Sequence, residues 1–373
     1  MKLSQLMEGL DYLVLQGDAE TEVADVAYDS RKVQPGFAFV CVVGTNRDSH
    51  DYAEDVAAAG ASVLVIQHKL DEMPAGVTVV QVENSRHALA IMSCNLFGNP
   101  AKKMTMIGVT GTKGKTTTAH MIQAALNAAG KKCGIIGTNG TAFAGERHAL
   151  ANTTPESYEL QKLFSEMLAA GCDSVVMEVS SQGLMMSRVD GIHFDVGVFT
   201  NLYPDHIGGP GEHQSFEEYR AWKGQLFRRC DVGVVNVDDK NCNTLLAGHT
   251  CRLDSYAMHK DADFVGSGLE LERGENFLGI SYQLSGVWNA RVRVNMPGEF
   301  SVYNSLAALA VGQVLGLEME AVCKGLEQVS VKGRVELVPV SKRFTVLIDF
   351  AHNEAGTENL LTTLRAYQPK RLV

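Results

Sequence analysis

Short apolar runs alternate along most of the chain with stretches in which apolar residues recur every three or four positions. The runs have the length of strands, and the stretches have the length of helices. Parallel strands need a crossover, usually a helix, between one strand and the next, so a parallel sheet covered by helices produces this alternation. The pattern therefore predicts an α/β fold with helices on both faces of the main sheet.

The first hundred residues follow this pattern and end in a break. Strands are predicted at Ala38–Val43, Ser62–Ile66 and Thr78–Val82, and helices at Asp51–Ala59 and Ser85–Leu96. Gly98, Asn99 and Pro100 come next, and this combination is typical of an interruption in regular structure. We therefore expect a first domain over residues 1–99.

A second α/β run starts after this break. Its first elements are strand Met104–Val109, a glycine-rich loop and helix Thr116–Ala129. Further strands are predicted at Cys133–Ile136, Ser174–Val179, Phe194–Thr200 and Val232–Val237, and a further helix at Tyr303–Leu315. Polar and apolar residues alternate between Gly268 and Arg293, which indicates an antiparallel hairpin added to the parallel sheet. We expect a central domain over residues 100–338.

Strand Thr345–Ile348 starts a third unit, residues 339–373, of only about 35 residues. A stretch of this length cannot bury the core of an α/β domain. The sequence therefore predicts a C-terminal domain that begins here and is largely missing from the chain.

Composition places the chain among ordinary globular proteins. Its 373 residues are 45% hydrophobic and 20% charged, which suits two or three domains with sizeable cores. The net charge near −10 opposes binding to nucleic acid or anionic lipid, so neither is expected as a partner. No apolar run approaches the roughly 18 residues of a membrane span, and the N-terminus lacks a signal peptide. The eight cysteines form no C-x-x-C pair, which favours a reducing cytoplasm.

The sharpest chemical signal is TGTKGKTT, residues 110–117, between a predicted buried strand and a predicted helix. Glycines let backbone N–H groups approach phosphate oxygens, and a lysine can reach the β- and γ-phosphates. Val109 replaces the first glycine of the strict G-x-x-x-x-G-K-[ST] motif. A glycine turn before a surface helix is the alternative, and the strand–loop–helix order disfavours it. The candidate phosphate-binding residues are Gly111, Thr112, Lys113, Gly114, Lys115, Thr116 and Thr117.

Polar residues follow several predicted strands at the point where each strand ends. They are Glu178, Asn201, Asp205, His206, Asp349 and His352. The carboxyl ends of strands in a doubly wound sheet border the ligand crevice, so these groups can converge on the phosphate loop. A glutamate and a histidine beside a phosphate-bound hydroxyl suit Mg²⁺. Each residue alone is equally compatible with a cap or a turn, whereas together they favour a site.

Lys223 lies on the apolar face of a predicted helical stretch at Phe216–Arg228. Burial there would lower its pKa, and a neutral amine can react with CO₂ to form a carbamate, which is an anionic oxygen ligand. A lysine whose stem is buried and whose ammonium reaches solvent is the alternative, and it is the commoner outcome on such a face.

Hydroxyls, amides and an arginine form a further group of candidates. Its members are Asn152, Thr153, Thr154, Ser180, Ser181, Gln182 and Arg188. Such groups suit a sugar phosphate or a carboxylate, and capping of loops explains them equally well. Ser30, within Asp29–Arg31, is a weaker candidate of the same kind.

Taken in order, these segments resemble the Mur ligases, ATP-dependent enzymes that form the amide bonds of peptidoglycan precursors. Within that family the chain is most similar to the MurE type, the UDP-N-acetylmuramoyl-tripeptide synthetases. The resemblance covers essentially the whole chain. It rests on DSR, GTNRDSH, TGTKGKTTT, NTTPES, MEVSSQGL, FTNLYPDH, Tyr219-x-x-x-Lys223, GEFSVYN, KGRVE and DFAH.

The resemblance implies a role for individual residues. Gly111 to Thr117 would bind the phosphates of ATP, with further nucleotide contacts from Asn304, Arg334 and Asp349. Mg²⁺ would be held by Thr116, Glu178, His206 and a carbamylated Lys223, and the catalytic residues would be Lys115, Glu178, His206 and Lys223. UDP-N-acetylmuramoyl dipeptide would be bound by Ser30, Thr45, Asn46, Arg47, Asn152, Thr153, Thr154, Ser180 and Arg188.

The resemblance also implies the reaction. The carboxylate of UDP-N-acetylmuramoyl-L-Ala-D-Glu would attack the γ-phosphate of ATP to give an acyl phosphate. The amine of L-lysine or meso-diaminopimelate would then displace phosphate, without any serine or cysteine nucleophile. We expect a cytoplasmic monomer that acts in cell-wall synthesis, and hence in cell shape and division.

Three departures from the family pattern keep alternatives open. Lys113 replaces the commoner Asn, Gln182 replaces the commoner His, and the family's Rossmann-like C-terminal domain does not follow Val373. One alternative is an incomplete or non-catalytic fragment that binds UDP-sugar and ATP. Another is a folylpolyglutamate synthase-like ligase, which the long N-terminal domain disfavours. A regulatory GTPase is also disfavoured, because no N-K-x-D-type string is present.

Overall fold

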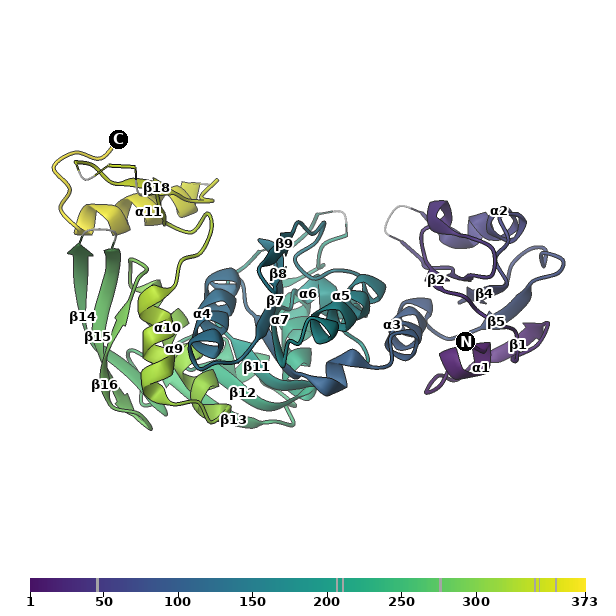
Figure 1. Cartoon of the computed structure of the whole chain (residues 1–373), viewed down its shortest axis with the longest axis horizontal. Coiled ribbons are helices and arrows are strands. Elements are labelled where there is room, and N and C mark those ends of the chain that lie inside the picture. The colour runs from purple at the N-terminus through teal and green to yellow at the C-terminus, as the bar shows by residue number, and fades with distance from the viewer. Residues whose placement is uncertain are drawn as a thin grey trace.

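The computed structural model describes the chain apart from Thr45, Asn46, His206, Pro210, Glu275, Asn276, Pro339, Lys342 and Asn353. The described residues form a five-stranded sheet, an eleven-stranded sheet and a two-stranded sheet. Figure 1 shows the N-terminal sheet at one end, the large sheet in the middle and the small sheet above the other end. The predicted α/β architecture with mainly parallel sheets is confirmed.

The N-terminal sheet has the strand order β1-β5-β4-β3-β2 and is parallel except for the β1–β5 pair. Its strands are β1 (Leu13–Gln16), β2 (Val26–Ala27), β3 (Ala38–Val40), β4 (Val63–Ile66) and β5 (Thr78–Gln81). Its α-helices are α1 (Leu3–Leu6), α2 (Ala53–Ala58) and α3 (Ser85–Leu96). All elements predicted here are confirmed, whereas β1, β2 and α1 were not predicted; β2 and α1 are too short to show a period in the sequence.

The central sheet has the order β16-β15-β14-β13-β12-β11-β6-β10-β7-β8-β9. Its strands are β6 (Thr105–Thr110), β7 (Cys133–Gly137), β8 (Gly140–Phe143), β9 (Glu146–His148), β10 (Ser174–Glu178), β11 (Phe194–Phe199), β12 (Cys230–Asn236), β13 (Arg252–Ala257), β14 (Phe264–Gly274), β15 (Phe277–Gly286) and β16 (Ala290–Val294). Pairing is parallel from β14 to β7 and antiparallel at both edges. The predicted antiparallel hairpin is therefore confirmed at one edge, and the β8–β9 hairpin was not predicted.

Helices cover both faces of the central sheet, as predicted. One face carries α4 (Lys115–Ala128), α9 (Phe300–Val314) and α10 (Met319–Gln328), and the other carries α5 (Ser157–Ala169), α6 (Ser181–Met185), α7 (Phe216–Gly224) and α8 (Cys242–Leu245). Successive residues of a strand serve the two cores in turn: in β10, Val176 joins the first core, and Val175 and Met177 join the second.

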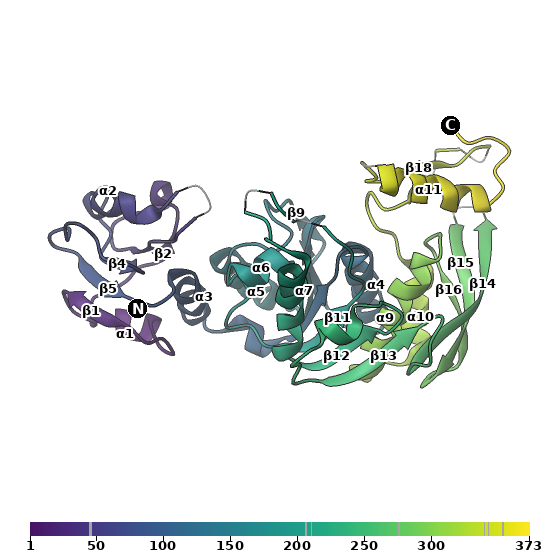
Figure 2. The same cartoon turned by 180° about the vertical axis from the view of Figure 1, so that it is seen from behind.

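The small unit after α10 lies beside the ends of β14 and β15, as both ribbon views show (Figures 1 and 2). Strands β17 (Glu336–Val338) and β18 (Val346–Ile348) pair antiparallel, and α11 (Glu354–Ala366) follows. The hydroxyl of Tyr367 donates to the carbonyl of Gly279 at 2.6 Å, and its own carbonyl accepts from Arg273 at 3.1 Å. These contacts attach the unit to the central sheet.

The predicted strand Thr345–Ile348 corresponds to β18. The domain limits 1–99, 100–338 and 339–373 remain predictions, and so does the largely missing C-terminal domain. Within the described part of the chain, every helix is too short or too polar to cross a lipid bilayer.

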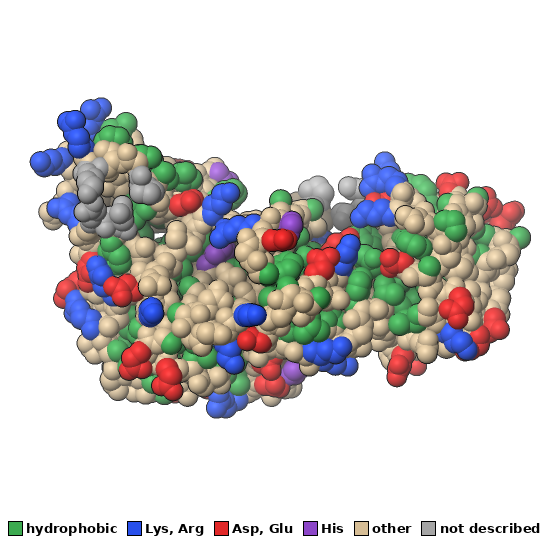
Figure 3. Space-filling model, viewed as in Figure 1, with side chains coloured by type: hydrophobic (Ala, Val, Ile, Leu, Met, Phe, Trp, Pro, Cys, Tyr) green, Lys and Arg blue, Asp and Glu red, His purple; other side chains and the backbone are tan. Residues whose placement is uncertain are grey.

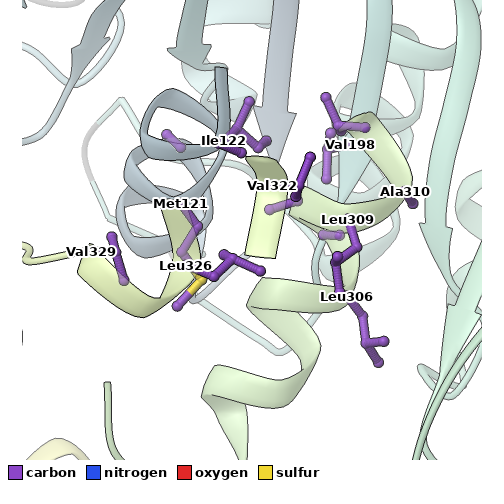
Figure 4. Close-up of a cluster of buried hydrophobic side chains, with 14 of the residues drawn as sticks. Met121, Ile122, Val198, Leu306, Leu309, Ala310, Val322, Leu326 and Val329 are labelled. Carbon is purple, nitrogen blue, oxygen red and sulfur yellow. The ribbon is translucent and has the colours of Figure 1, made fainter. Parts of the chain in front are cut away.

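The core beneath α4, α9 and α10 is closely packed (Figure 4). Met121 and Ile122 of α4 lie buried against Val322 and Leu326 of α10. The two helices approach so closely that a Cβ on Gly325 would lie 2.6 Å from the carbonyl oxygen of Ala124. Glycine is required here because the neighbouring atoms belong to backbone and cannot rotate away.

We expect Gly325→Ala to lower the free energy of unfolding by about 1–3 kcal/mol, the usual cost of extra atoms in a packed core. The better helix propensity of alanine offsets at most about 1 kcal/mol of the gross cost. Urea unfolding measures the change. Lys324→Ala, on the exposed side of the same helix, is the control and should stay within about 0.5 kcal/mol of the unaltered chain. Equal stability of both variants would contradict the close approach of α10 to α4.

Candidate functional site

The carboxyl ends of the central parallel strands border a cavity of about 560 Å³. Its walls come from the loop before α4, the segment before α5, the start of α6, helix α7 and part of the C-terminal unit. Figure 3 shows the molecule hollowed along this edge. The predicted site residues that line the cavity are Thr112, Lys113, Gly114, Lys115, Thr116, Thr117, Asn152, Thr153, Thr154, Glu178, Ser180, Ser181, Gln182, Arg188, Asp205, Lys223, Arg334 and His352.

A second cavity of about 560 Å³ lies near Lys131, Lys132 and Arg147, and no predicted site residue lines it. Volume alone does not distinguish the two cavities. The first one is distinguished by the polar side chains that converge on it.

The loop between β6 and α4 has the backbone of a phosphate cradle. It connects a buried strand to the start of a 14-residue helix, where N–H groups and the helix dipole attract anions. Gly111 and Gly114 have φ values of 146° and 86°, which other residues rarely adopt. A Cβ on Gly111 would also lie 2.0 Å from Oγ1 of Thr200. The glycines are thus required by both backbone angle and space.

Asn201 holds this loop from the end of the neighbouring strand β11. Its Oδ1 accepts from the N–H of Lys113 at 2.9 Å, and its Nδ2 donates to the carbonyl of Lys113 at 3.0 Å. Its own carbonyl accepts from the N–H of Thr112 at 2.9 Å. The hydroxyl of Thr200 donates to the Lys113 carbonyl at 2.8 Å. Sequence reasoning noted Asn201 only as a polar residue at a strand end and gave it no role in shaping the loop.

Glu178, at the end of β10, is a buried carboxylate with three donors. Its Oε1 accepts from the hydroxyl of Thr116 at 2.9 Å and from the N–H of Thr138 at 2.8 Å, and its Oε2 accepts from the Thr138 hydroxyl at 3.2 Å. These bonds compensate the cost of burying the charge. Hydroxyl and carboxylate oxygens therefore meet beside the phosphate loop, and Mg²⁺ prefers such ligands. Sequence reasoning missed Thr138, since no motif singles it out.

The partly buried Lys115 and the buried Lys223 share one carbonyl oxygen. The Nζ atoms of Lys115 and Lys223 each donate to the carbonyl of Gly111 at 2.9 Å. The Lys223 ammonium lies 4.6 Å from the centre of the Tyr219 ring. Burial lowers the pKa of Lys115, and burial together with the charge of Lys115 lowers the pKa of Lys223 well below its ordinary value.

The structure excludes one of the two interpretations of Lys223. The whole residue is only 2% exposed, so an ammonium that reaches solvent is wrong. Tyr219, Leu226 and Phe227 of the same stretch are buried as well, whereas Phe216 is partly buried. Its amine lies in the wall of the cavity, beside the phosphate loop.

The remaining wall combines hydroxyls and an arginine. The hydroxyl of Thr154 donates to the Glu178 carbonyl at 2.9 Å and accepts from the N–H of Ser180 at 3.0 Å. Arg188 donates to the Thr154 carbonyl at 3.0 Å. Ser180 accepts from the N–H of Gly183 and so caps α6. The capping interpretation is therefore correct for Ser180, which nevertheless lines the cavity.

Other predicted residues lie outside the cavity wall. Asn304 abuts the loop at Gly114 and accepts from the hydroxyl of Thr118 at 3.1 Å. Asp349 accepts from two N–H groups of its own unit, those of Val335 and Ala351, each at 2.8 Å. Ser30 and Arg47 belong to the N-terminal part. The predictions for Thr45, Asn46 and His206 lie outside the described residues.

Among the residues that the structure describes, one group has the side chains of a metal site: Asp48, His50 and His68 in the N-terminal part. Nε2 of His50 accepts from the N–H of Gln67 at 3.0 Å, which places the ring proton on Nδ1, toward Asp48. A protonated ring nitrogen cannot bind a metal ion, and Asp48 also pairs with His68 at 2.8 Å. The group is a hydrogen-bonded cluster.

A phosphate loop at the end of a central parallel strand, beside a polar cavity, defines a nucleotide-binding α/β protein. Sequence models of known families match two parts of the chain. The Mur ligase family, catalytic domain, matches residues 22–95, and the Mur ligase middle domain matches residues 109–312. The UDP-N-acetylmuramoyl-L-alanyl-D-glutamate–2,6-diaminopimelate ligase of Clostridium perfringens is 38% identical over 380 residues, which cover 100% of this chain and 77% of that protein.

Solved structures share the fold. A UDP-N-acetylmuramoyl-L-alanyl-D-glutamate–2,6-diaminopimelate ligase matches with a TM-score of 0.83 and 22% identity over 98% of this chain and 74% of that chain. The MurF ligase of Thermotoga maritima in complex with ADP matches with a TM-score of 0.62 and 18% identity. The match covers 94% of this chain and 76% of that chain. Folylpolyglutamate synthase of Mycobacterium tuberculosis matches with a TM-score of 0.61 and 21% identity. The match covers 75% of this chain and 70% of that chain. The chain belongs to the Mur ligase family, and the diaminopimelate ligases that it matches are of the MurE type, so the resemblance is confirmed.

We expect Asn201→Ala to weaken ADP binding about thirtyfold, because the loop loses two hydrogen bonds worth about 1 kcal/mol each. Calorimetric titration with ADP measures the change. Asn241→Ala is the control, because Asn241 donates to the Leu202 carbonyl at 3.0 Å but makes no bond to the loop. The Kd of ADP for this variant should stay within about twofold of that of the unaltered chain. An unchanged Kd for Asn201→Ala would show that the loop keeps its shape without this clamp.

Proposed function

We propose that the chain adds meso-diaminopimelate to UDP-N-acetylmuramoyl-L-Ala-D-Glu, with hydrolysis of ATP, in peptidoglycan synthesis. Relatives at 35–38% identity are named for this activity, and the matches span 75–77% of their lengths. The observation that carries the proposal is that one cavity joins the phosphate loop to the Thr154, Ser180 and Arg188 wall. Two ligands can therefore meet at the end of β6.

ATP is the nucleotide that we assign to the loop. A Mur ligase of the same fold has been solved with ADP, which supports a nucleotide of this kind. Lys115 lies at the helix start, where it can pair with the β- and γ-phosphates. Arg334, whose guanidinium lies 5.1 Å from the centre of the Phe350 ring, and Asn304 would contact the rest of the nucleotide. The role proposed for Asp349 is support of this region, since its carboxylate already binds two N–H groups.

Thr116 and Glu178 fit Mg²⁺, since both offer oxygen ligands at one point beside the loop. His206 and a carbamylated Lys223 would complete the group. When bound, Mg²⁺ would neutralise part of the phosphate charge. Carbamylation joins the neutral Lys223 amine to CO₂ and releases one proton. The low pKa of the amine favours this reaction, and the neighbouring Lys115 ammonium would stabilise the negative carbamate.

The UDP substrate would extend from Ser30 and the Thr45–Arg47 loop to Asn152, Thr153, Thr154, Ser180 and Arg188. Arg188 suits a carboxylate or a phosphate because a guanidinium donates two parallel hydrogen bonds. No side chain needs to form a covalent intermediate, since the residues bind the reactants and orient them. The match of residues 22–95 to the Mur ligase family favours this substrate over a folate. A cytoplasmic monomer remains a prediction.

The decisive assay is phosphate release with ATP, Mg²⁺ and UDP-N-acetylmuramoyl-L-Ala-D-Glu, with either diaminopimelate or L-lysine added. We expect release that requires the UDP substrate and diaminopimelate. Lys115→Ala is the control for contaminating ATPases and should release none, because it removes a cation from the transferring phosphate. Binding of both ligands without release would favour the non-catalytic alternative, and release with L-lysine alone would overturn the choice of amino acid.

We expect Lys223→Ala to lower kcat on the order of 10²–10³-fold, since it removes a charged group beside the reacting phosphate. The Kd of the UDP substrate should change little, and short-chain carboxylates should restore part of the activity by replacing the carbamate. Steady-state kinetics with and without added acetate measure both effects. Lys240→Ala, at an exposed position, is the matched control. Full activity of Lys223→Ala would contradict the assignment of a carbamate to Lys223.

A further inference from the structure

We propose that Arg86 and Glu156 are positioning residues for the UDP substrate, which hold Arg188 of the cavity wall against the N-terminal part of the chain. The identity of the substrate in this inference rests on the proposed function. The linkage itself rests on contacts between described side chains.

Glu156 lies between two arginines, one beside the N-terminal sheet and one beside the central sheet. Its Oε1 lies 2.8 Å from Nη2 of Arg188, which follows α6, and its Oε2 lies 3.5 Å from Nη1 of Arg86, which belongs to α3. All three side chains are largely buried, with 19%, 16% and 21% of their surface exposed for Glu156, Arg188 and Arg86. One carboxylate thus connects the cavity wall to the helix that follows the N-terminal sheet.

Arg86 extends the connection to the loop that contains Arg47. Its Nε donates to the carbonyl of Val43 at 3.3 Å. Val43 forms a bridge with Asp48 that closes this loop, and the N–H of Gly44 donates to the Arg47 carbonyl at 2.9 Å inside it. Arg86 therefore contacts the base of a loop assigned to one end of the substrate and the carboxylate beside the other end.

Arg188 is held on one side and left with a free donor. Nη1 donates to the Thr154 carbonyl, and Nη2 pairs with Glu156. Its Nε is buried and has no partner among the described residues. A planar guanidinium held by two acceptors has a fixed orientation, so its remaining N–H groups point in fixed directions and are ready to bind a carboxylate or phosphate oxygen. Glu156 fixes this orientation, whereas a neutral amide would hold it less firmly.

Glu159, one turn further along, makes similar contacts across the same interface. It accepts from the hydroxyl of Tyr28 at 2.7 Å and lies 3.9 Å from Nζ of Lys32. It makes no bond to Arg188 or to any residue of the cavity wall. The change in substrate Kd on loss of Glu159 therefore measures what the contact with the N-terminal part alone contributes to binding. Any larger change on loss of Glu156 measures the positioning of Arg188.

The test compares Glu156→Gln, Glu159→Gln, Arg86→Ala and Arg86→Lys in the full chain. Calorimetry gives the Kd of UDP-N-acetylmuramoyl-L-Ala-D-Glu and of ADP. We expect Glu156→Gln and Arg86→Ala to weaken the UDP substrate about tenfold and fivefold, with the Kd of ADP unchanged. Glu159→Gln should change either Kd by less than about twofold.

Arg86→Lys keeps the positive charge and should recover part of the affinity that Arg86→Ala loses. The double variant Glu156→Gln with Arg86→Ala should lose less binding free energy than the sum of the two single losses, because both residues act through one contact.

Equal losses in Glu156→Gln and Glu159→Gln, or unchanged affinity in Glu156→Gln, would overturn the positioning role. A thermal unfolding midpoint measured for each variant separates these results from loss of the fold, and the conservative Arg86→Lys remains testable if Arg86→Ala unfolds. If the unaltered chain binds ADP but not the UDP dipeptide, the proposed substrate fails. If it binds both and the variants match it, only the positioning role fails.

Discussion

The placement of β6 between β10 and β11 is the constraint on which the site depends. Parallel pairing sets Glu178 opposite Val109 on one side and Phe199 opposite Thr110 on the other. All three strands consequently end at the same level, and the residues that follow them meet at the loop. Glu178 then contacts Thr116 from one side while Thr200 and Asn201 clamp Lys113 from the other. A shift in register would separate these groups.

The buried charges of the site are tolerated because nearly every one has a partner. Glu178 has three donors, and Lys115 and Lys223 share the Gly111 carbonyl. Two amines in a low-dielectric wall repel each other when both are protonated, which favours the neutral form of Lys223. The same environment strengthens the attraction between the Lys115 ammonium and an anion placed beside it. The wall is thus arranged for negatively charged ligands before any ligand arrives.

The contact between the N-terminal part and the central sheet combines apolar packing, as between Phe97 and Tyr158, with polar pairs. It includes Tyr158 with Asp25, Tyr28 with Glu159, and Arg86 with Glu156. Polar contacts of this type can break and form again without exposing much apolar surface. Such polar contacts fix the orientation of the two parts but stabilise their association only weakly. This suits a substrate site shared between two parts of one chain.

The sequence by itself determined the elements and the chemistry of the loop. Period and length predicted β6, α4 and α9 closely, and the glycines and lysines of residues 110–117 indicated a phosphate site, because these signals lie in neighbouring residues. The apolar face around Lys223 left open whether its ammonium is buried or reaches solvent, and the structure shows it buried. Only the tertiary structure decided which residues complete the site. Lys223 and Gly111 are 112 positions apart, Asn201 and Lys113 are 88 apart, and Thr138 and Glu178 are 40 apart. Such pairs follow from strand order and register, which no local pattern specifies.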